Sequence, residues 1–269
     1  MRDLAGRIVI AVPLLVAVLA AAYFDGWWLF AVVVVAAVIA LHELYSIVRP
    51  LRPLVLAGYA GVLTGLLGAE LGGVEWLFAG LLATFVFAFG LYGIAETRQS
   101  GTVTIATTIL GAFWIGAGVG HLILLRDVGG DNDYFGRLAI FTVLLAVWAG
   151  DTVAYFVGRL VGRHRLAAVL SPGKTWEGFV AGSAASVLVA FFALYQDRDE
   201  FLAIWQALAL GVVIAVAGTI GDLFESAVKR DMQVKDTGRL LGGHGGVLDR
   251  IDSLLFVSVA AFYTIVALH

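Results

Sequence analysis

The chain has 269 residues and no cysteine; 61% of its residues are hydrophobic and only 14% are charged. Soluble domains are about half apolar and about a quarter charged, so this composition predicts an integral membrane protein. The absence of cysteine excludes disulfides, thiol nucleophiles and cysteine-ligated metal centres. A net charge of −3 gives no reason to expect nucleic acid as a partner.

Long apolar segments recur along the whole chain. A helix needs about 20 apolar residues to cross the ~30 Å hydrocarbon core of a bilayer. This rule predicts an all-α, polytopic integral membrane protein with about nine transmembrane helices, at residues 8–24, 27–48, 54–68, 75–95, 102–125, 138–158, 175–195, 201–223 and 251–268. A cleavable signal peptide is the alternative for the first of them.

Basic residues are distributed unevenly between the two ends of these helices. Of the 17 Lys and Arg residues, 14 lie at the N-terminus or in the connections after the second, fourth, sixth and eighth helices. The positive-inside rule therefore places these connections in the cytoplasm, at a cell inner (plasma) membrane. Polar groups become dense after about residue 148. We therefore interpret 1–135 as a transmembrane scaffold and 136–269 as the transmembrane catalytic region, with a cytoplasmic catalytic loop between the last two helices.

The segment 221–253 holds a disproportionate share of the ionisable groups. Four of its residues have the i, i+4, i+7, i+8 spacing that shares one helix face: Asp222, Ser226, Lys229 and Arg230. A carboxylate that ligates a cation, together with two basic residues that meet phosphate oxygens, suits a metal-bound phosphate. A charged helix end that faces lipid headgroups is the alternative.

A glycine-rich turn precedes the last predicted helix. Glycines at 242, 243, 245 and 246 surround His244, and three charged residues open the helix that follows: Asp249, Arg250 and Asp252. Glycine lets the backbone approach a ligand, so such a loop before a helix N-terminus favours phosphate binding. The alternatives are a surface turn for the loop, and ordinary partners of the helix dipole for the acidic residues.

Polar residues also lie between the sixth and seventh predicted helices. Asp151 is ionisable inside a predicted span and is therefore a functional candidate; a structural pair with an arginine is the alternative. Small residues at 154, 158 and 162 predict close helix packing. Ser171 is expected to cap the seventh helix, with Pro172 at its first position.

Lys174, at the expected start of the seventh helix, is a candidate phosphate contact. The Gly-Lys-Thr triplet around it is not a P-loop, because Ala168 stands where the motif requires glycine and no strand is predicted before it. His42, Glu43 and His121 are interpreted as packed or interfacial polar residues.

In their order and spacing, these motifs resemble the signature of the phosphatidate cytidylyltransferases, also called CDP-diacylglycerol synthases. The similar stretches are Asp151-x-x-Ala-Tyr155-x-x-Gly158, Ser171-Pro172-x-Lys174-Thr175-x-Glu177-Gly178, Ser226-x-x-Lys229-Arg230, Lys235-Asp236 and His244-Gly245-Gly246-x-x-Asp249-Arg250-x-Asp252. Two positions depart from the pattern. Gly242 stands where proline is common, and Gly173 stands where a second lysine is common, which removes one phosphate contact.

The resemblance implies a membrane transferase of phospholipid biosynthesis that converts CTP and phosphatidate to CDP-diacylglycerol and pyrophosphate. In that reaction the lipid phosphate attacks the α-phosphorus of CTP in line, and metal ions neutralise the developing charge. The resemblance implies Mg²⁺ at Asp222 and Asp249, with Asp151 as a further ligand. A second cation such as K⁺ and a homodimer are further expectations.

The remaining roles are also those that the resemblance implies. The catalytic set is Asp222, Ser226, Lys229, Arg230, Lys235, Asp236, His244, Asp249, Arg250 and Asp252. The substrate-binding set is Tyr155, Ser171, Lys174, Thr175, Gly245 and Gly246.

Two other functions stay open. One is a different CTP-using membrane enzyme, such as a polyprenol kinase or an archaeal-lipid cytidylyltransferase. The other is an ion-coupled transporter with Asp151 and Asp222 in its pathway. Transporters often have paired, interrupted helices in two halves, whereas this chain concentrates its polar groups in one half.

Overall fold

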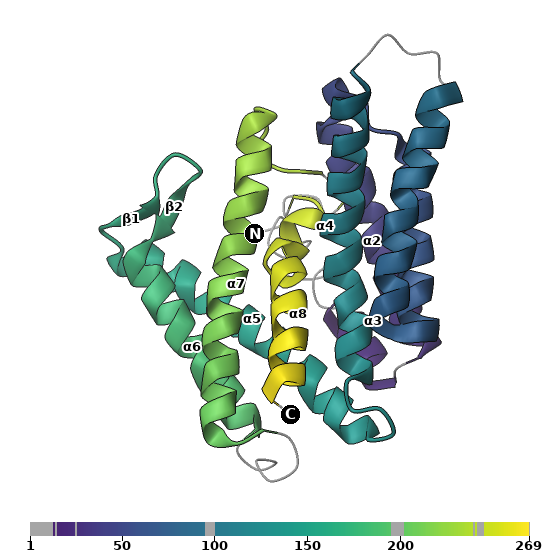
Figure 1. The fold of residues 1–269 in the computed structure, drawn as a ribbon. Helices are drawn as coiled ribbons and strands as arrows, with labels where there is room; N and C mark the ends of the chain where they lie inside the picture. Colours follow the sequence, from purple (N-terminus) through teal and green to yellow (C-terminus); the bar gives the residue numbers. More distant parts are fainter. Residues whose placement is uncertain are drawn as a thin grey trace. The chain divides into compact units, whose positions relative to one another are not determined.

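The computed structural model describes residues 13, 15–24, 26–94, 100–194, 202–238, 240 and 245–268. These residues are almost entirely α-helical (Figure 1), and six of the helices are long and apolar enough to cross a membrane. Two shorter apolar helices, Leu15–Phe24 and Trp176–Phe192, accompany them. The all-α class with several membrane-length helices agrees with the prediction. The count of nine spans and the cytoplasmic position of the catalytic loop stay predictions.

The chain forms two compact units. The first unit combines Met1–Leu124 with Asp231–Ile251, and the second combines Leu125–Arg230 with Asp252–His269. The first contains α2 (Trp27–Ile47), the 3₁₀ helix η1 (Arg49–Leu51), α3 (Val55–Ile94) and most of α4 (Gly101–Asp127). The second contains α5 (Asp133–Val161), β1 (Arg165–Ala167), β2 (Ser171–Thr175), α6 (Trp176–Leu194) and nearly all of α7 (Ile204–Asp231). Helix α8 (Leu248–Leu268) begins in the first unit and continues in the second. The division at residue 135 stays a prediction.

Helix α3 folds back on itself at Gly73. This residue has φ 75° and ψ −157°, a conformation that glycine adopts without steric cost. The two halves of α3 then contact each other, because a Cβ atom added to Gly80 would lie 2.4 Å from the backbone nitrogen of Gly65. The turn lies between residues 54–68 and 75–95, which the sequence predicts as separate spans.

The C-terminal half of α2 is firmly held inside the first unit. The Tyr45 hydroxyl donates a 2.6 Å hydrogen bond to the carbonyl of Thr108 on α4. Leu41 and Leu44 are buried beside it. The tyrosine ring lies against Gly111, where an added Cβ atom would be 2.6 Å from the ring. This packing fixes the end of α2 that carries Glu43.

Helices α5 and α6 pack closely in the second unit. A Cβ atom added to Gly182 would lie 2.7 Å from the Cβ of Ala154, and one added to Gly178 would lie 2.7 Å from the Ala154 carbonyl oxygen. Small residues thus line the contact on both helices, as the spacing at 154, 158 and 162 predicts. Gly162 itself lies at the C-cap of α5, outside the helix.

The connection between α5 and α6 is an antiparallel hairpin, which the sequence did not predict. Strands β1 and β2 pair Arg165 with Thr175 and Ala167 with Ser171. Helix α6 begins only at Trp176, and its cap is Thr175, whose Oγ1 accepts a 3.1 Å hydrogen bond from the Gly178 amide. The prediction that Ser171 caps this helix is therefore wrong, because residues 171–175 are extended and pair with β1. The expectation that no strand precedes the Gly-Lys-Thr triplet is also wrong, because β1 precedes it. The triplet itself lies within β2 and does not form a P-loop.

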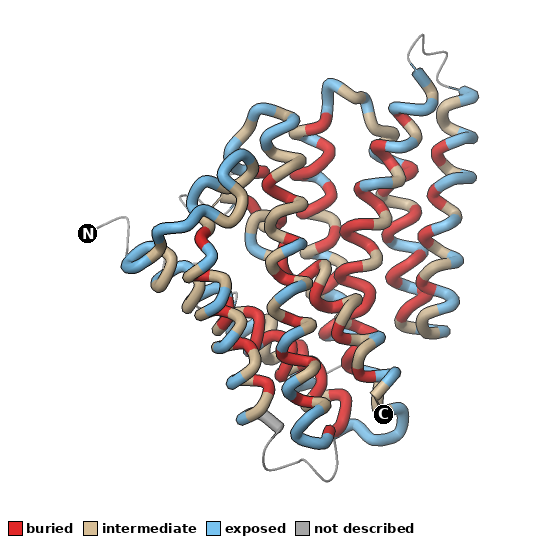
Figure 2. The backbone as a smooth tube through the Cα atoms, turned by 60° about the vertical axis from the view of Figure 1, so that its left-hand side comes forward, coloured by how far each residue is buried: buried red, intermediate tan, exposed pale blue. Residues whose placement is uncertain are grey.

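Many large apolar side chains remain exposed on the long helices, where buried and exposed residues alternate along the tube (Figure 2). Val86 and Phe89 on α3, for example, are 71% and 72% exposed. Extensive exposed apolar surface marks contact with a membrane or a partner. Together with the length of the helices, it agrees with a multi-pass membrane protein.

Candidate functional site

A cluster of opposite charges lies in the second unit. Asp222 lies on α7, and its Oδ2 is 2.5 Å from the Nζ of Lys174 on β2. Asp151 on α5 and Asp252 on α8 are both close enough to Asp222 to interact with it electrostatically. Helix α7 runs without a break to Asp231, as the spacing of the charged residues predicts. The structure therefore brings together four predicted site residues from four different elements.

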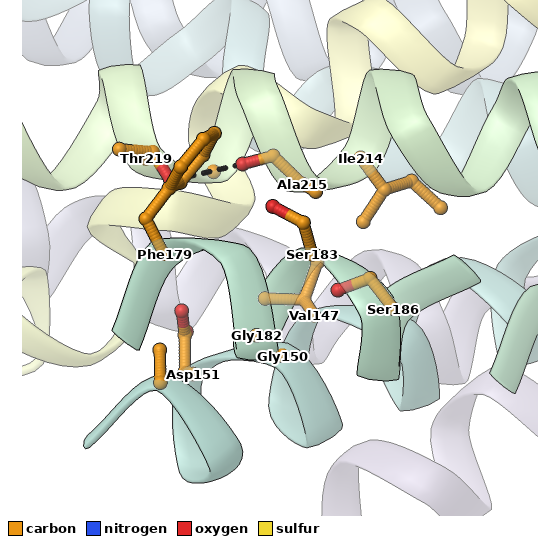
Figure 3. A pocket seen from close by; sticks show the side chains of 12 residues that line it. Val147, Gly150, Asp151, Phe179, Gly182, Ser183, Ser186, Ile214, Ala215 and Thr219 are labelled. Atoms are coloured by element: carbon orange, nitrogen blue, oxygen red, sulfur yellow. Dashed lines mark hydrogen bonds between the residues drawn. The ribbon is translucent and has the colours of Figure 1, made fainter. Parts of the chain in front are cut away.

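Asp151 lines a small cavity between α5, α6 and α7 (Figure 3). The cavity measures about 40 Å³, which is room for a few water molecules and far less than a nucleotide requires. Two further lining residues donate hydrogen bonds: Ser186 on α6 donates to the carbonyl of Ala146 on α5, and Thr219 donates to the carbonyl of Ala215 on its own helix, α7. The Ser253 side chain hydrogen-bonds Asp151. Asp151 is thus hydrogen-bonded to a residue of α8 and borders a space large enough for water.

The two basic residues of α7, Lys229 and Arg230, have protein partners. Lys229 forms an ion pair with Glu225, whose side chain is 1% exposed. Arg230 donates from Nε to the carbonyl of Leu170, which lies in the turn of the hairpin, over 3.2 Å. Ser226 is buried on the same helix. The sequence reasoning did not include Glu225; its i,i+4 spacing to Lys229 is the signal that would have identified the pair.

Three other residues of the substrate-binding set lie on α5 and on β2. Tyr155 is exposed on α5, and its hydroxyl accepts a 2.9 Å hydrogen bond from Arg159. Ser171 lies at the start of β2, opposite Ala167. Thr175 is buried and its hydroxyl is used as the cap of α6. Lys174 is the member of this set that joins the charged cluster.

In the first unit, Asp249 organises the end of the glycine-rich turn. Its Oδ2 accepts hydrogen bonds from the Thr237 amide (3.0 Å), the Thr237 hydroxyl (3.0 Å) and the Gly246 amide (2.8 Å). One carboxylate oxygen therefore joins two segments that flank the turn. Lys235, Asp236 and Arg250 are exposed in the same unit. His244, with the glycines at 242 and 243, lies outside the described residues.

Glu43 reaches the same turn from α2. Its Oε1 accepts from the Val247 amide at 3.1 Å and its Oε2 from the Leu248 amide at 2.9 Å. The side chain is only 6% exposed. The interpretation of Glu43 and His121 as packed polar residues is confirmed, since His121 is fully buried and its Nδ1 lies 2.8 Å from the Ala117 carbonyl. The contact of Glu43 with the start of α8 was not predicted.

The side chains of the charged cluster have the chemistry that magnesium requires. Asp151, Asp222 and Asp252 offer carboxylate oxygens, and Mg²⁺ at phosphate sites usually takes one or two carboxylates and completes its shell with water and phosphate. Over the part of the chain that the structure describes, Asp, Glu and His side chains form no ready-made group of three or more metal ligands. The donor set fits a divalent cation that completes its shell with water or with phosphate oxygens. Asp222 belongs to the second unit and Asp249 to the first.

Comparison with known proteins matches residues 5–268 to the sequence pattern of the Cytidylyltransferase family. The chain is 31% identical over 292 residues to the phosphatidate cytidylyltransferase of Mycobacterium bovis, an alignment that covers 99% of this chain and 90% of that protein. It is 37% identical over 166 residues to the phosphatidate cytidylyltransferase of Staphylococcus haemolyticus, covering 62% of this chain and 61% of that protein. The aligned part thus spans less than two thirds of the Staphylococcus haemolyticus relative. The match over residues 5–268 shows that the chain belongs to the cytidylyltransferase family.

Proposed function

We propose that the chain is a phosphatidate cytidylyltransferase, which converts CTP and phosphatidate to CDP-diacylglycerol and pyrophosphate. The observation that carries the proposal is the similarity to the Mycobacterium bovis protein of that name, which extends over 99% of this chain. The charged cluster around Asp222 supports it, because carboxylates and basic side chains lie together there. Such a set suits a metal-bound polyphosphate.

The reaction needs no nucleophile from the protein, because the lipid phosphate is already an anion. One of its oxygens forms a bond to the α-phosphorus of CTP, and the bond from that phosphorus to the oxygen bridging to the β-phosphate breaks. Pyrophosphate leaves with the electron pair. The task of the protein is to orient the two phosphates and to stabilise negative charge as it shifts.

The side chains divide into two groups under this proposal. Basic residues meet phosphate oxygens and help to hold CTP: Lys174, Lys229, Arg230, Lys235 and Arg250. Ser226 and His244 position those phosphates. Asp222 and Asp151 would hold Mg²⁺, which when bound neutralises charge on the phosphates. Asp249 as a further metal ligand, and Asp236 and Asp252 as supporting residues, stay predictions. A further K⁺ and a homodimer stay predictions.

The enzyme would work at the cytoplasmic face of the inner membrane. The support is the distribution of Lys and Arg, of which 14 out of 17 fall on one side of the predicted spans. Six membrane-length apolar helices support a multi-pass protein, which gives the lipid substrate direct access from the bilayer.

A labelled-nucleotide assay tests the function. The purified protein in detergent is incubated with α-³²P-CTP, phosphatidate and Mg²⁺, with and without EDTA. We expect label in a chloroform-extractable product, its loss with EDTA, and its return with excess Mg²⁺. A folded protein that yields no labelled lipid would contradict the proposal. Label that reaches lipid only from γ-³²P-CTP would instead identify a kinase.

Replacing Lys174 with Ala is expected to lower kcat/KM for CTP by about tenfold to 100-fold. The substitution removes the cation 2.5 Å from Asp222 and leaves that carboxylate beside Asp151 and Asp252 with less compensating charge. A charge-assisted phosphate contact is lost at the same time. Steady-state kinetics with CTP as the varied substrate measure the effect. Arg163→Ala, which removes another exposed basic residue next to the hairpin, should leave kcat/KM within about twofold of the unsubstituted protein.

A further inference from the structure

Glu43 is a buried carboxylate whose contacts converge on Thr237 and on the start of α8. Its two oxygens each accept one backbone amide at the start of α8, from Val247 and Leu248. We propose that Glu43 is a positioning residue, which holds Asp249 and the start of α8 in the geometry that CTP binding requires. This inference rests on the proposed function.

The contact with α8 satisfies groups that the helix itself leaves unpaired. The first amides of an α-helix have no intrahelical acceptor, and the aligned peptide dipoles give this end a partial positive charge. A carboxylate can accept hydrogen bonds from these amides and also carries the negative charge that the dipole favours. Here the carboxylate is that of Glu43 on α2, about 200 residues earlier in the sequence. Because the side chain is 6% exposed, water does not compete strongly for these hydrogen bonds.

Thr237 links Glu43 to Asp249. The Thr237 hydroxyl lies 3.0 Å from Oδ2 of Asp249 and 3.5 Å from Oε2 of Glu43. The amides of Thr237 and Gly246 also donate to that same oxygen of Asp249. The orientation of the Asp249 carboxylate therefore depends on the segment that Glu43 holds in place.

Two glycines allow the backbone to pass directly against the Glu43 carboxylate. A Cβ atom added to Gly238 would lie 2.3 Å from Oε1, and one added to Gly246 would lie 2.4 Å from Oε2. Both distances are far below van der Waals contact, so no side chain fits at either position without displacing Glu43. Gly238 and Gly246 thus lie against one carboxylate, which therefore fixes two stretches of backbone relative to each other.

Glu43→Gln tests the proposal in the full-length protein. Glutamine keeps the size of the side chain but replaces one acceptor oxygen with an NH₂ group, which then faces a backbone N–H. We expect amide hydrogen exchange to rise in peptides that cover 245–250 and to stay unchanged in α3 and α5. We expect kcat/KM for CTP to fall by about tenfold to 100-fold, with a smaller change in KM for phosphatidate, because small displacements of binding groups have effects of this order.

The matched control is Glu75→Gln, which removes an exposed carboxylate in the same unit and should change neither readout. Glu43→Asp serves as a second variant. It keeps two acceptor oxygens on a shorter side chain and should restore part of the activity that glutamine loses, and it also keeps the test valid if Glu43→Gln fails to fold.

Wild-type kinetics and wild-type exchange in Glu43→Gln would overturn the proposal. So would a rise in exchange throughout the chain with unchanged kinetics per folded molecule, because that result describes a purely structural residue. An unsubstituted protein without cytidylyl transfer would refute the proposed function. Even without cytidylyl transfer, amide hydrogen exchange at 245–250 in Glu43→Gln still shows whether Glu43 holds the start of α8.

Discussion

Asp222→Asn is expected to reduce cytidylyl transfer by a factor of about 100 to 1,000 while the protein remains folded. Asn has nearly the same volume as Asp but lacks its charge, so it binds a divalent cation far more weakly and no longer pairs with Lys174. The folded state should tolerate the change, because Asp151 and Asp252 lose a like-charged neighbour. A loss of turnover without a loss of folding distinguishes a functional carboxylate from a structural one.

The measurement combines the α-³²P-CTP assay with a thermal unfolding curve in the same detergent. Asp231→Asn is the control, since Asp231 is an exposed carboxylate at the end of the same helix, and its activity should match that of the unsubstituted protein. If Asp222→Asn kept more than a tenth of the activity, Asp222 would not be part of the catalytic machinery.

A large loss of stability is expected from Gly80→Ala, at the contact between the two halves of α3. The new methyl group would lie 2.4 Å from the Gly65 nitrogen and 2.5 Å from the Thr64 carbonyl carbon. Both are backbone atoms, which cannot rotate away as the end of a side chain can, so the two halves of α3 must separate. Overpacking of this kind costs about 1–3 kcal/mol, and sometimes more.

Gly90→Ala on the same helix is the matched control. A Cβ atom there would meet nothing within 4 Å, and alanine favours a helix over glycine by up to about 1 kcal/mol. We therefore expect a lower midpoint of thermal unfolding for Gly80→Ala and an equal or higher one for Gly90→Ala. Equal midpoints for the two variants would show that the halves of α3 do not pack closely through Gly65 and Gly80.

Most of the helices could be predicted from hydropathy alone. A segment that crosses a bilayer must satisfy its backbone hydrogen bonds internally, so an apolar run of sufficient length becomes a helix whatever surrounds it. The predicted ranges 27–48, 102–125 and 201–223 each correspond to a helix, although α7 continues to Asp231. The turn at Gly73 falls between two predicted ranges, 54–68 and 75–95.

Predictions from local sequence were wrong where the conformation of a segment depends on a partner elsewhere in the chain. Ser171 and Pro172 have the residue types of a helix start, yet pairing with β1 keeps them extended and moves the cap to Thr175. Within the site, Asp151, Lys174 and Asp222 come together as the motif order suggested. Glu43 was not identified as a site residue, since a single carboxylate in an apolar helix carries no local signal of what it will bind.

The contact between Glu43 and the start of α8 also has a consequence for biosynthesis. The partners of this carboxylate, Val247 and Leu248, follow it by 204 and 205 residues. At roughly 5–20 residues per second, translation needs about 10–40 s to reach them. During that time α2 carries a carboxylate whose unpaired burial in an apolar environment is costly. The first unit is therefore completed only after residues 231–251 have been synthesised.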